Sequence, residues 1–98
     1  MSDLQFVWDP RKAEDNKRKH GVSFEEARSV FLDDNALLRA DPDHSEEEDR
    51  FVMLGLSSGL RILVVCHCYR ESEDVIRLIS ARKAAKREGE LYTRRVKR

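Results

Sequence analysis

The chain has 98 residues, of which 19 are Lys or Arg and 19 are Asp or Glu, so its formal net charge is zero. This neutrality argues against a protein that coats nucleic acid through bulk charge, and no apolar run approaches the ~20 residues of a membrane-spanning helix. The charges are unevenly distributed: residues 1–49 carry 7 basic and 14 acidic side chains, whereas residues 50–98 carry 12 and 5. Such an asymmetry indicates a basic functional surface or an acidic partner.

The length predicts a single domain over residues 1–98. The first four residues have neither a basic flank nor an apolar run, so we expect no signal peptide. We also expect no membrane association. Cys66 and Cys68 are one residue apart in a predicted strand, where both point the same way and rarely form a disulfide. These features indicate a cytoplasmic protein.

The first half of the chain predicts a strand over residues 4–8, followed by two helices. Asp9 and Pro10 are start signals for a helix that ends near His20, with Gly21 as its C-terminal cap. Ser23 opens the second helix, and Glu26 completes a capping box with it. The apolar stripe of this second helix consists of Phe24, Ala27, Val30 and Phe31.

The second half predicts successive strands with short connections, and therefore an antiparallel meander. The predicted strands cover residues 36–41, 50–56, 60–69 and 75–80, with an acidic turn over 41–49. An amphipathic helix is expected from Ala81 to about Val96, with Ser80 as its N-cap. The order is β-α-α-β-β-β-β-α, an α+β domain in which helices pack against a twisted antiparallel sheet.

A basic tract, Lys17 to His20, ends the first predicted helix close to the start of the second. Cations and free backbone N–H groups there could bind an anion. The alternative, which spacing alone favours, is that the cations only complement the helix dipole.

His67 is the second candidate, because an imidazole titrates near neutral pH and can transfer protons. On a strand it lies opposite Cys66 and Cys68, so if the cysteines face the core, His67 faces away from it. A structural histidine is the alternative. A zinc site is not favoured, because His67 points away from the cysteines and there is no second ligand pair.

Arg77 interrupts an apolar strand, and Arg82 and Lys83 stand at the predicted start of the last helix, where cations oppose the dipole. Either they bind an anion such as a phosphate, or acids such as Asp9 or Glu25 neutralise them. Segment 82–98 is basic, which fits either a nucleic-acid surface or a solvated helix face.

Two blocks, KHGVSFEEA (19–27) and ISARKA (79–84), resemble the BrnT toxin family in combination. The similarity extends from about Phe6 to Tyr92 and includes the turn that begins at Asp41 and the pair Arg50-Phe51. It implies a RelE-like fold and a ribonuclease toxin of a bacterial type II toxin–antitoxin module that inhibits translation. It also implies a BrnA-like antitoxin with a ribbon-helix-helix element, which binds the toxin directly and through which the complex represses its promoter. Leu56 departs from the pattern, because many relatives carry a basic residue there.

Together these features predict a metal-independent endoribonuclease without a cofactor. The 2′-hydroxyl of RNA would attack the adjacent phosphate and leave a 2′,3′-cyclic product. The predicted catalytic residues are His20, His67, Arg77 and Arg82, and the predicted RNA-binding residues are Lys19, Lys83, Arg61 and Tyr92. The alternative function is a catalytically silent module that only co-represses with its antitoxin. A third hypothesis, that the chain itself binds DNA, is less favoured, because no helix pair forms a helix-turn-helix pattern.

Overall fold

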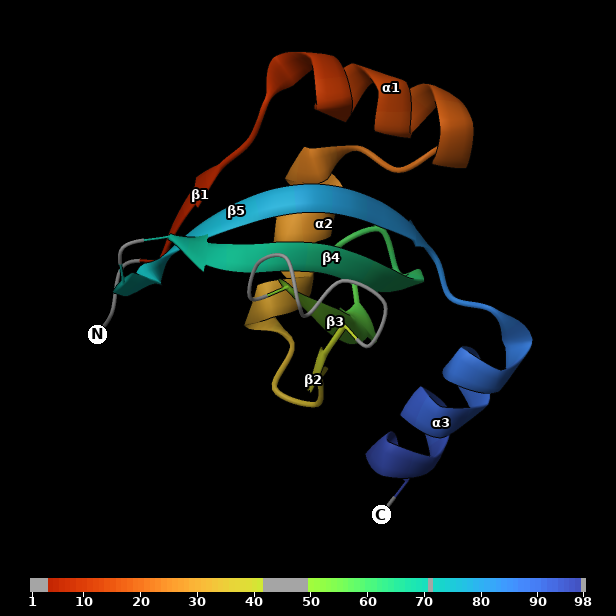
Figure 1. The fold of residues 1–98 in the computed structure, drawn as a ribbon. Coiled ribbons are helices and arrows are strands. Elements are labelled where there is room, and N and C mark those ends of the chain that lie inside the picture. Colours follow the sequence, from red (N-terminus) through yellow and green to blue (C-terminus); the bar gives the residue numbers. More distant parts are fainter. Residues whose placement is uncertain (1–3, 42–49, 71, 98) are drawn as a thin grey trace.

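The computed structural model describes residues 4–41, 50–70 and 72–97 (Figure 1). None of the helices in that part of the chain is long and apolar enough to cross a membrane. Most of the predicted 41–49 turn lies outside the described residues. The elements in chain order are β1 (Gln5–Val7), α1 (Pro10–His20), α2 (Phe24–Ser29), the 3-10 turn η1 (Val30–Leu32), β2 (Leu37–Ala40), β3 (Arg50–Leu56), β4 (Ile62–Arg70), β5 (Ser72–Lys83) and α3 (Lys86–Val96).

The five strands form one sheet in the order β1-β5-β4-β3-β2. β2 to β5 make the predicted antiparallel meander. β1 departs from the prediction: it pairs with β5 in parallel, with Phe6 opposite Ile76. A parallel pair needs a long connection, and here α1, α2 and the meander lie between the two strands. The local pattern around residues 4–8 specifies a strand but says nothing about which strand it joins.

The helix signals of the first half act as predicted. Asp9 accepts a hydrogen bond from the Arg11 N–H at the start of α1, and Gly21 ends the helix in the left-handed region at φ 69°. Ser23 caps α2 by accepting from the Glu26 N–H at 3.0 Å. The Glu26 carboxylate, however, bonds to Ser57 and Arg61 instead of completing the predicted capping box.

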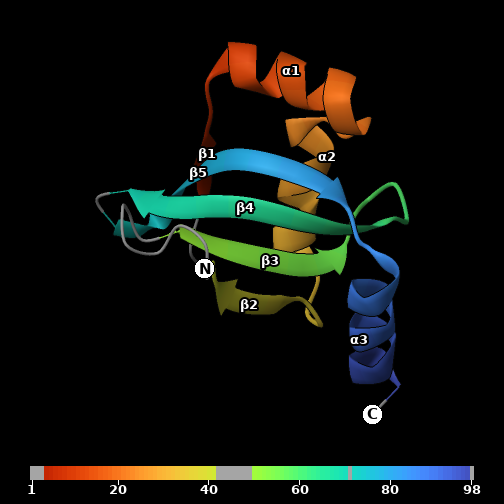
Figure 2. The same ribbon diagram turned by 45° about the vertical axis from the view of Figure 1, so that its right-hand side comes forward.

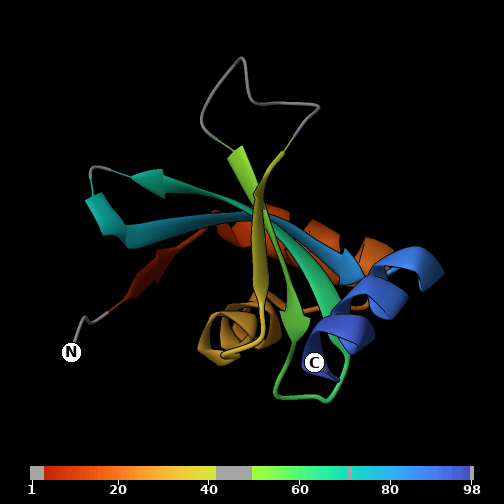
Figure 3. The same cartoon turned by 90° about the horizontal axis from the view of Figure 1, so that it is seen from below.

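Helix α2 crosses one side of the sheet, α1 lies along β5, and α3 lies at the end where β3 finishes and β5 leaves (Figure 2). The main core is between α2 and the sheet, and its buried members are Val22, Phe24, Ala27, Val30, Leu63, Val65, Ile76, Leu78 and Ala81. A smaller cluster on the other face packs α3 against the sheet through Leu54, Val64 and Tyr92. Seen from below, α3 covers only one end of that face (Figure 3).

The boundary between β5 and α3 corrects one prediction. The expected helix start at Ala81 is wrong, because β5 continues to Lys83, paired with Leu63 of β4, and α3 begins only at Lys86. Ser80 therefore lies within the strand and does not cap the helix. The anion site at a helix N-terminus that was considered for Arg82 and Lys83 is lost with it. Continuous pairing with β4 outweighs the helix propensity of the alanines in this segment.

Candidate functional site

The sheet face opposite α2 carries arginines from three strands. Strand pairing places Arg50 opposite Cys68 and Cys68 opposite Arg77, so both arginines lie on one face. Val64 is opposite Arg82 on that same face, and Val52 is opposite Arg39. We call Arg39, Arg50, Arg77 and Arg82 the arginine face. Alternation along each strand produces this face, and a register shift at Ile79 in β5 brings Arg77 and Arg82, five residues apart, onto the same side.

A depression of about 240 Å³ lies in the arginine face, beside the end that α3 covers. Its polar walls are Asp41, Arg50, Ser80 and Arg82, with the Cys66 thiol between them. Within the described residues, no three His, Cys, Asp or Glu side chains come together as a metal site would require. The lining of the depression combines two cations, a carboxylate and a hydroxyl, and its volume is large enough for a phosphate group.

The pKa of the Cys66 thiol reflects the charged groups that line this depression. Its thiol donates to Asp41 Oδ2 at 3.7 Å. Burial, and then the negative charge of Asp41, raise the pKa of Cys66 to about 11, against the opposing effects of Arg50 and Ser80. Cys66 is therefore a neutral thiol near neutral pH, and the charged groups around it are Asp41 and Arg50.

Arg82 is held in place by an acid of the last helix. Its Nη1 and Nη2 atoms donate to the two carboxylate oxygens of Glu88, each at 2.8 Å. This pair lowers the pKa of Glu88 and raises that of Arg82. The neutralising acid is thus Glu88, and neither Asp9 nor Glu25, the acids considered from the sequence. The Arg82 side chain remains 45 % exposed, so it can also face a ligand.

Arg77 lies on the same face but lines a separate depression of about 350 Å³ with Val7, Trp8 and Arg70. The predicted catalytic arginines therefore share a side of the sheet without lining one cavity.

His67 points to the opposite side of the sheet. Its side chain is 0 % exposed and packs edge-to-face on Phe31, with ring centroids 4.8 Å apart. Nδ1 is 3.1 Å from the Val65 carbonyl oxygen, and Nε2 has no hydrogen-bond partner. Burial lowers the pKa of His67. The sequence left open which side of β4 faces the core; the structure gives the core side to His67 and the arginine side to Cys66.

Lys19 and His20 lie exposed at the C-terminal end of α1, and Lys83 is exposed at the end of β5. α1 is anchored over this part of β5 by Asn16, whose side chain bonds to Ala81. These three predicted residues thus belong to the α1 side of the sheet, away from the arginine face.

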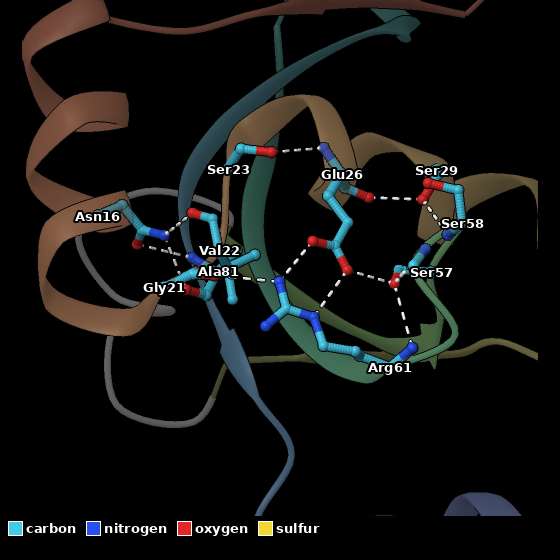
Figure 4. A network of polar contacts seen from close by, with 11 residues as sticks. Asn16, Gly21, Val22, Ser23, Glu26, Ser29, Ser57, Ser58, Arg61 and Ala81 are labelled. Carbon is cyan, nitrogen blue, oxygen red and sulfur yellow. Dashed lines mark hydrogen bonds and ion pairs between the residues drawn. The ribbon is translucent and has the colours of Figure 1, made fainter.

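Arg61 and Tyr92 are both engaged in holding the structure together. Arg61 donates to Glu26 Oε2 at 3.0 Å and to the Gly21 carbonyl at 3.0 Å, so it ties the β3–β4 turn to both N-terminal helices (Figure 4). Tyr92 is 6 % exposed and its hydroxyl donates to Asp33 at 2.5 Å. Burial and Asp33 raise the pKa of Tyr92 to about 12. In this conformation the ring of Tyr92 is not available for stacking on a base.

The sequence reasoning missed three residues of this face: Arg39, Asp41 and Arg50. The signal was present, because β3 carries Arg50 two residues before Val52 and four before Leu54, which fixes its face. Asp41 ends the predicted strand over residues 36–41 and begins the predicted acidic turn. Its backbone N–H in fact donates to the Arg50 carbonyl at 2.9 Å, which continues the β2–β3 pairing by one residue.

The same architecture is found in a known protein structure. The chain is similar to the ribonuclease toxin BrnT of Brucella abortus, known from a 1.1 Å crystal structure, with a TM-score of 0.65 and 24 % sequence identity. The match covers 85 % of this chain and 99 % of that one, and it shows a shared fold. No curated protein matches the sequence. The model of the family described as the ribonuclease toxin BrnT of type II toxin–antitoxin systems matches residues 8–88. This match spans most of the sequence, both blocks included, and the chain therefore belongs to the BrnT toxin family.

Proposed function

We propose that this toxin is a metal-independent endoribonuclease with a RelE-like fold, and that it cleaves RNA on the arginine face. The 2′-hydroxyl of the substrate attacks the neighbouring phosphate, so the protein needs no nucleophile of its own. Cations that stabilise the charge developing on the phosphorus oxygens are then the main requirement. The observation that carries the proposal is the placement of Arg77 and Arg82 on one exposed face.

The other predicted residues take roles that fit their positions. Lys19, His20 and Lys83, on the α1 side, contact RNA that extends past the cleaved bond. His67 and Tyr92 belong to the two cores, and Arg61 belongs to the turn that Glu26 holds.

The first prediction concerns the product and the arginines. Purified protein incubated with RNA in EDTA is expected to leave 2′,3′-cyclic phosphate ends, which analysis of the 3′ termini detects. Arg82→Ala should lower the cleavage rate by about 100-fold or more, because it removes a cation that faces developing charge. Arg77→Ala should also lower the rate, but by less, because Arg77 lines the separate depression. Arg28→Ala, which removes a cation from α2, is the matched control and should cleave at the original rate.

Thermal unfolding of each variant separates loss of chemistry from loss of fold, which matters because Arg82 also binds Glu88. A strict metal requirement, or full activity in both arginine variants, would contradict the proposal.

Type II family membership implies an antitoxin partner as well as an RNA target. We infer that this partner is a BrnA-like ribbon-helix-helix protein whose acidic side chains cover the arginine face in the cytoplasm, and that promoter DNA is bound only through the complex. Expression of the toxin without antitoxin distinguishes the alternative function: arrested growth with RNA loss supports the nuclease, and normal growth supports a silent co-repressor.

A further inference from the structure

The depression beside Arg82 already contains the groups that cleavage by a 2′-hydroxyl requires. Two guanidinium groups, Arg50 and Arg82, stand beside the Ser80 hydroxyl and the Asp41 carboxylate, and all four line one cavity of about 240 Å³. Transesterification of RNA needs cations for the phosphate and a group that accepts the 2′-hydroxyl proton. The predicted histidines do not supply that acceptor here, because His67 is sealed on the other side of the sheet and His20 lies on α1.

Asp41 is the remaining proton acceptor in the depression. The Cys66 thiol holds its proton near neutral pH. The Ser80 hydroxyl is a very weak base, and it would have to lose its own proton to another base before it could accept one. The carboxyl oxygens of Asp41 carry lone pairs that can accept the proton of a 2′-hydroxyl.

The fold holds the backbone of Asp41 in place. Asp41 follows β2 directly, its backbone N–H bonds to the Arg50 carbonyl, and the residue is only 8 % exposed. Its carboxylate accepts a hydrogen bond from the Cys66 thiol, and both residues line the depression. A buried, anchored carboxylate loses little freedom when a substrate binds, which favours proton transfer.

We propose that Asp41 is the general base of RNA cleavage and that Arg50 and Arg82 hold the scissile phosphate next to it. This inference rests on the proposed function and assigns its missing base. In the step, the 2′-O–H bond breaks and its proton passes to Asp41. The 2′-oxygen–phosphorus bond forms as the bond from phosphorus to the 5′-oxygen breaks. The departing oxygen takes a proton from water, and Asp41 returns its own to solvent.

The test is Asp41→Asn, which keeps the size of the side chain and removes its basicity. Single-turnover cleavage of RNA in EDTA is expected to slow by about 10²–10⁴-fold. The dissociation constant for an uncleavable RNA with 2′-deoxy substitution at the cleaved position should change less than about threefold, because Arg50 and Arg82 remain. Asp34→Asn, an exposed acid outside the depression, is the matched control and should retain the original rate.

The outcomes separate this inference from the proposed function. If the unaltered protein does not cleave RNA, the proposed function fails. If it cleaves and Asp41→Asn cleaves equally well, only the assignment of Asp41 fails. Where Asp41→Asn melts at a lower temperature, Asp41→Glu decides: a carboxylate on a longer arm should restore at least about tenfold of the lost rate. A folded Asp41→Glu variant as slow as Asp41→Asn would overturn the proposal.

Discussion

His67 is a titratable side chain enclosed by aromatic rings. Phe31, Phe51 and Tyr69 surround it, and its Nε2 atom has no partner within the described residues. A charged imidazole in that setting would lose hydration without gaining an acid to pair with. The neutral form is therefore the folded form, which accords with the lowered pKa.

This enclosure predicts an acid-sensitive fold. Below about pH 6.5 the unfolded chain protonates His67 whereas the folded chain does not, so the free energy of unfolding falls as the pH decreases. His67→Phe should remove this part of the pH dependence, as measured by urea unfolding between about pH 5 and pH 7. His20→Phe alters an exposed imidazole and should leave the slope intact. A slope unchanged in His67→Phe would contradict the assignment.

At the scale of elements, α1 is attached to the sheet through one buried amide. Asn16 Nδ2 donates to the carbonyls of Val22 and Ala81 at 3.0 and 2.8 Å, and Oδ1 accepts from the Ala81 N–H at 3.0 Å. Within the described residues, Ala13 is the only apolar side chain of α1 that packs on the main core. The helix therefore depends on a polar contact where most amphipathic helices depend on apolar area.

Loss of this amide should be costly. Asn16→Ala leaves two carbonyls and one N–H without their partner in a buried place, and is expected to lower the free energy of unfolding by about 2–4 kcal/mol. Lys17→Ala, one residue further on the exposed side of α1, should change it by less than about 0.5 kcal/mol. Denaturant titration measures both, and similar values for the two variants would argue against the role of Asn16.

At the scale of the whole molecule, the zero net charge conceals a localised basic surface. Three of the four residues of the arginine face come from the second half of the chain, whose net charge is +7, and only Arg39 comes from the first. These side chains lie on one side of the sheet because successive side chains of a strand point to opposite faces, and the strand pairing aligns the arginines on the same face. A protein with no net charge can in this way concentrate positive charge on one face.

Arg39 offers a test of this distribution, since it lies on the face but outside the depression that holds Asp41. Arg39→Ala should weaken binding of single-stranded RNA and reduce the slope of log affinity against log salt concentration by about 0.7, the value for one phosphate contact. Arg28→Ala, on α2, should leave that slope unchanged. Binding titrations at several salt concentrations measure it, and equal slopes for Arg39→Ala and the unaltered protein would remove Arg39 from the RNA surface.

The sequence by itself determined what depends on neighbours along the chain. Asp9 and Gly21 fix the limits of α1, an apolar run that ends in a turn predicts β3, and the two sequence blocks identify the family. Tertiary structure decided what depends on distant partners: the parallel pairing of β1, the extension of β5 through Arg82, and the engagement of Arg61 by Glu26.

His67 shows the physical reason most clearly. Alternation in a strand sorts side chains into two sets, but β4 is apolar on both faces, so the pattern cannot say which set meets the helices. Only the packing of α2 on one side placed His67 in the core and opened the other side to Asp41 and the arginines.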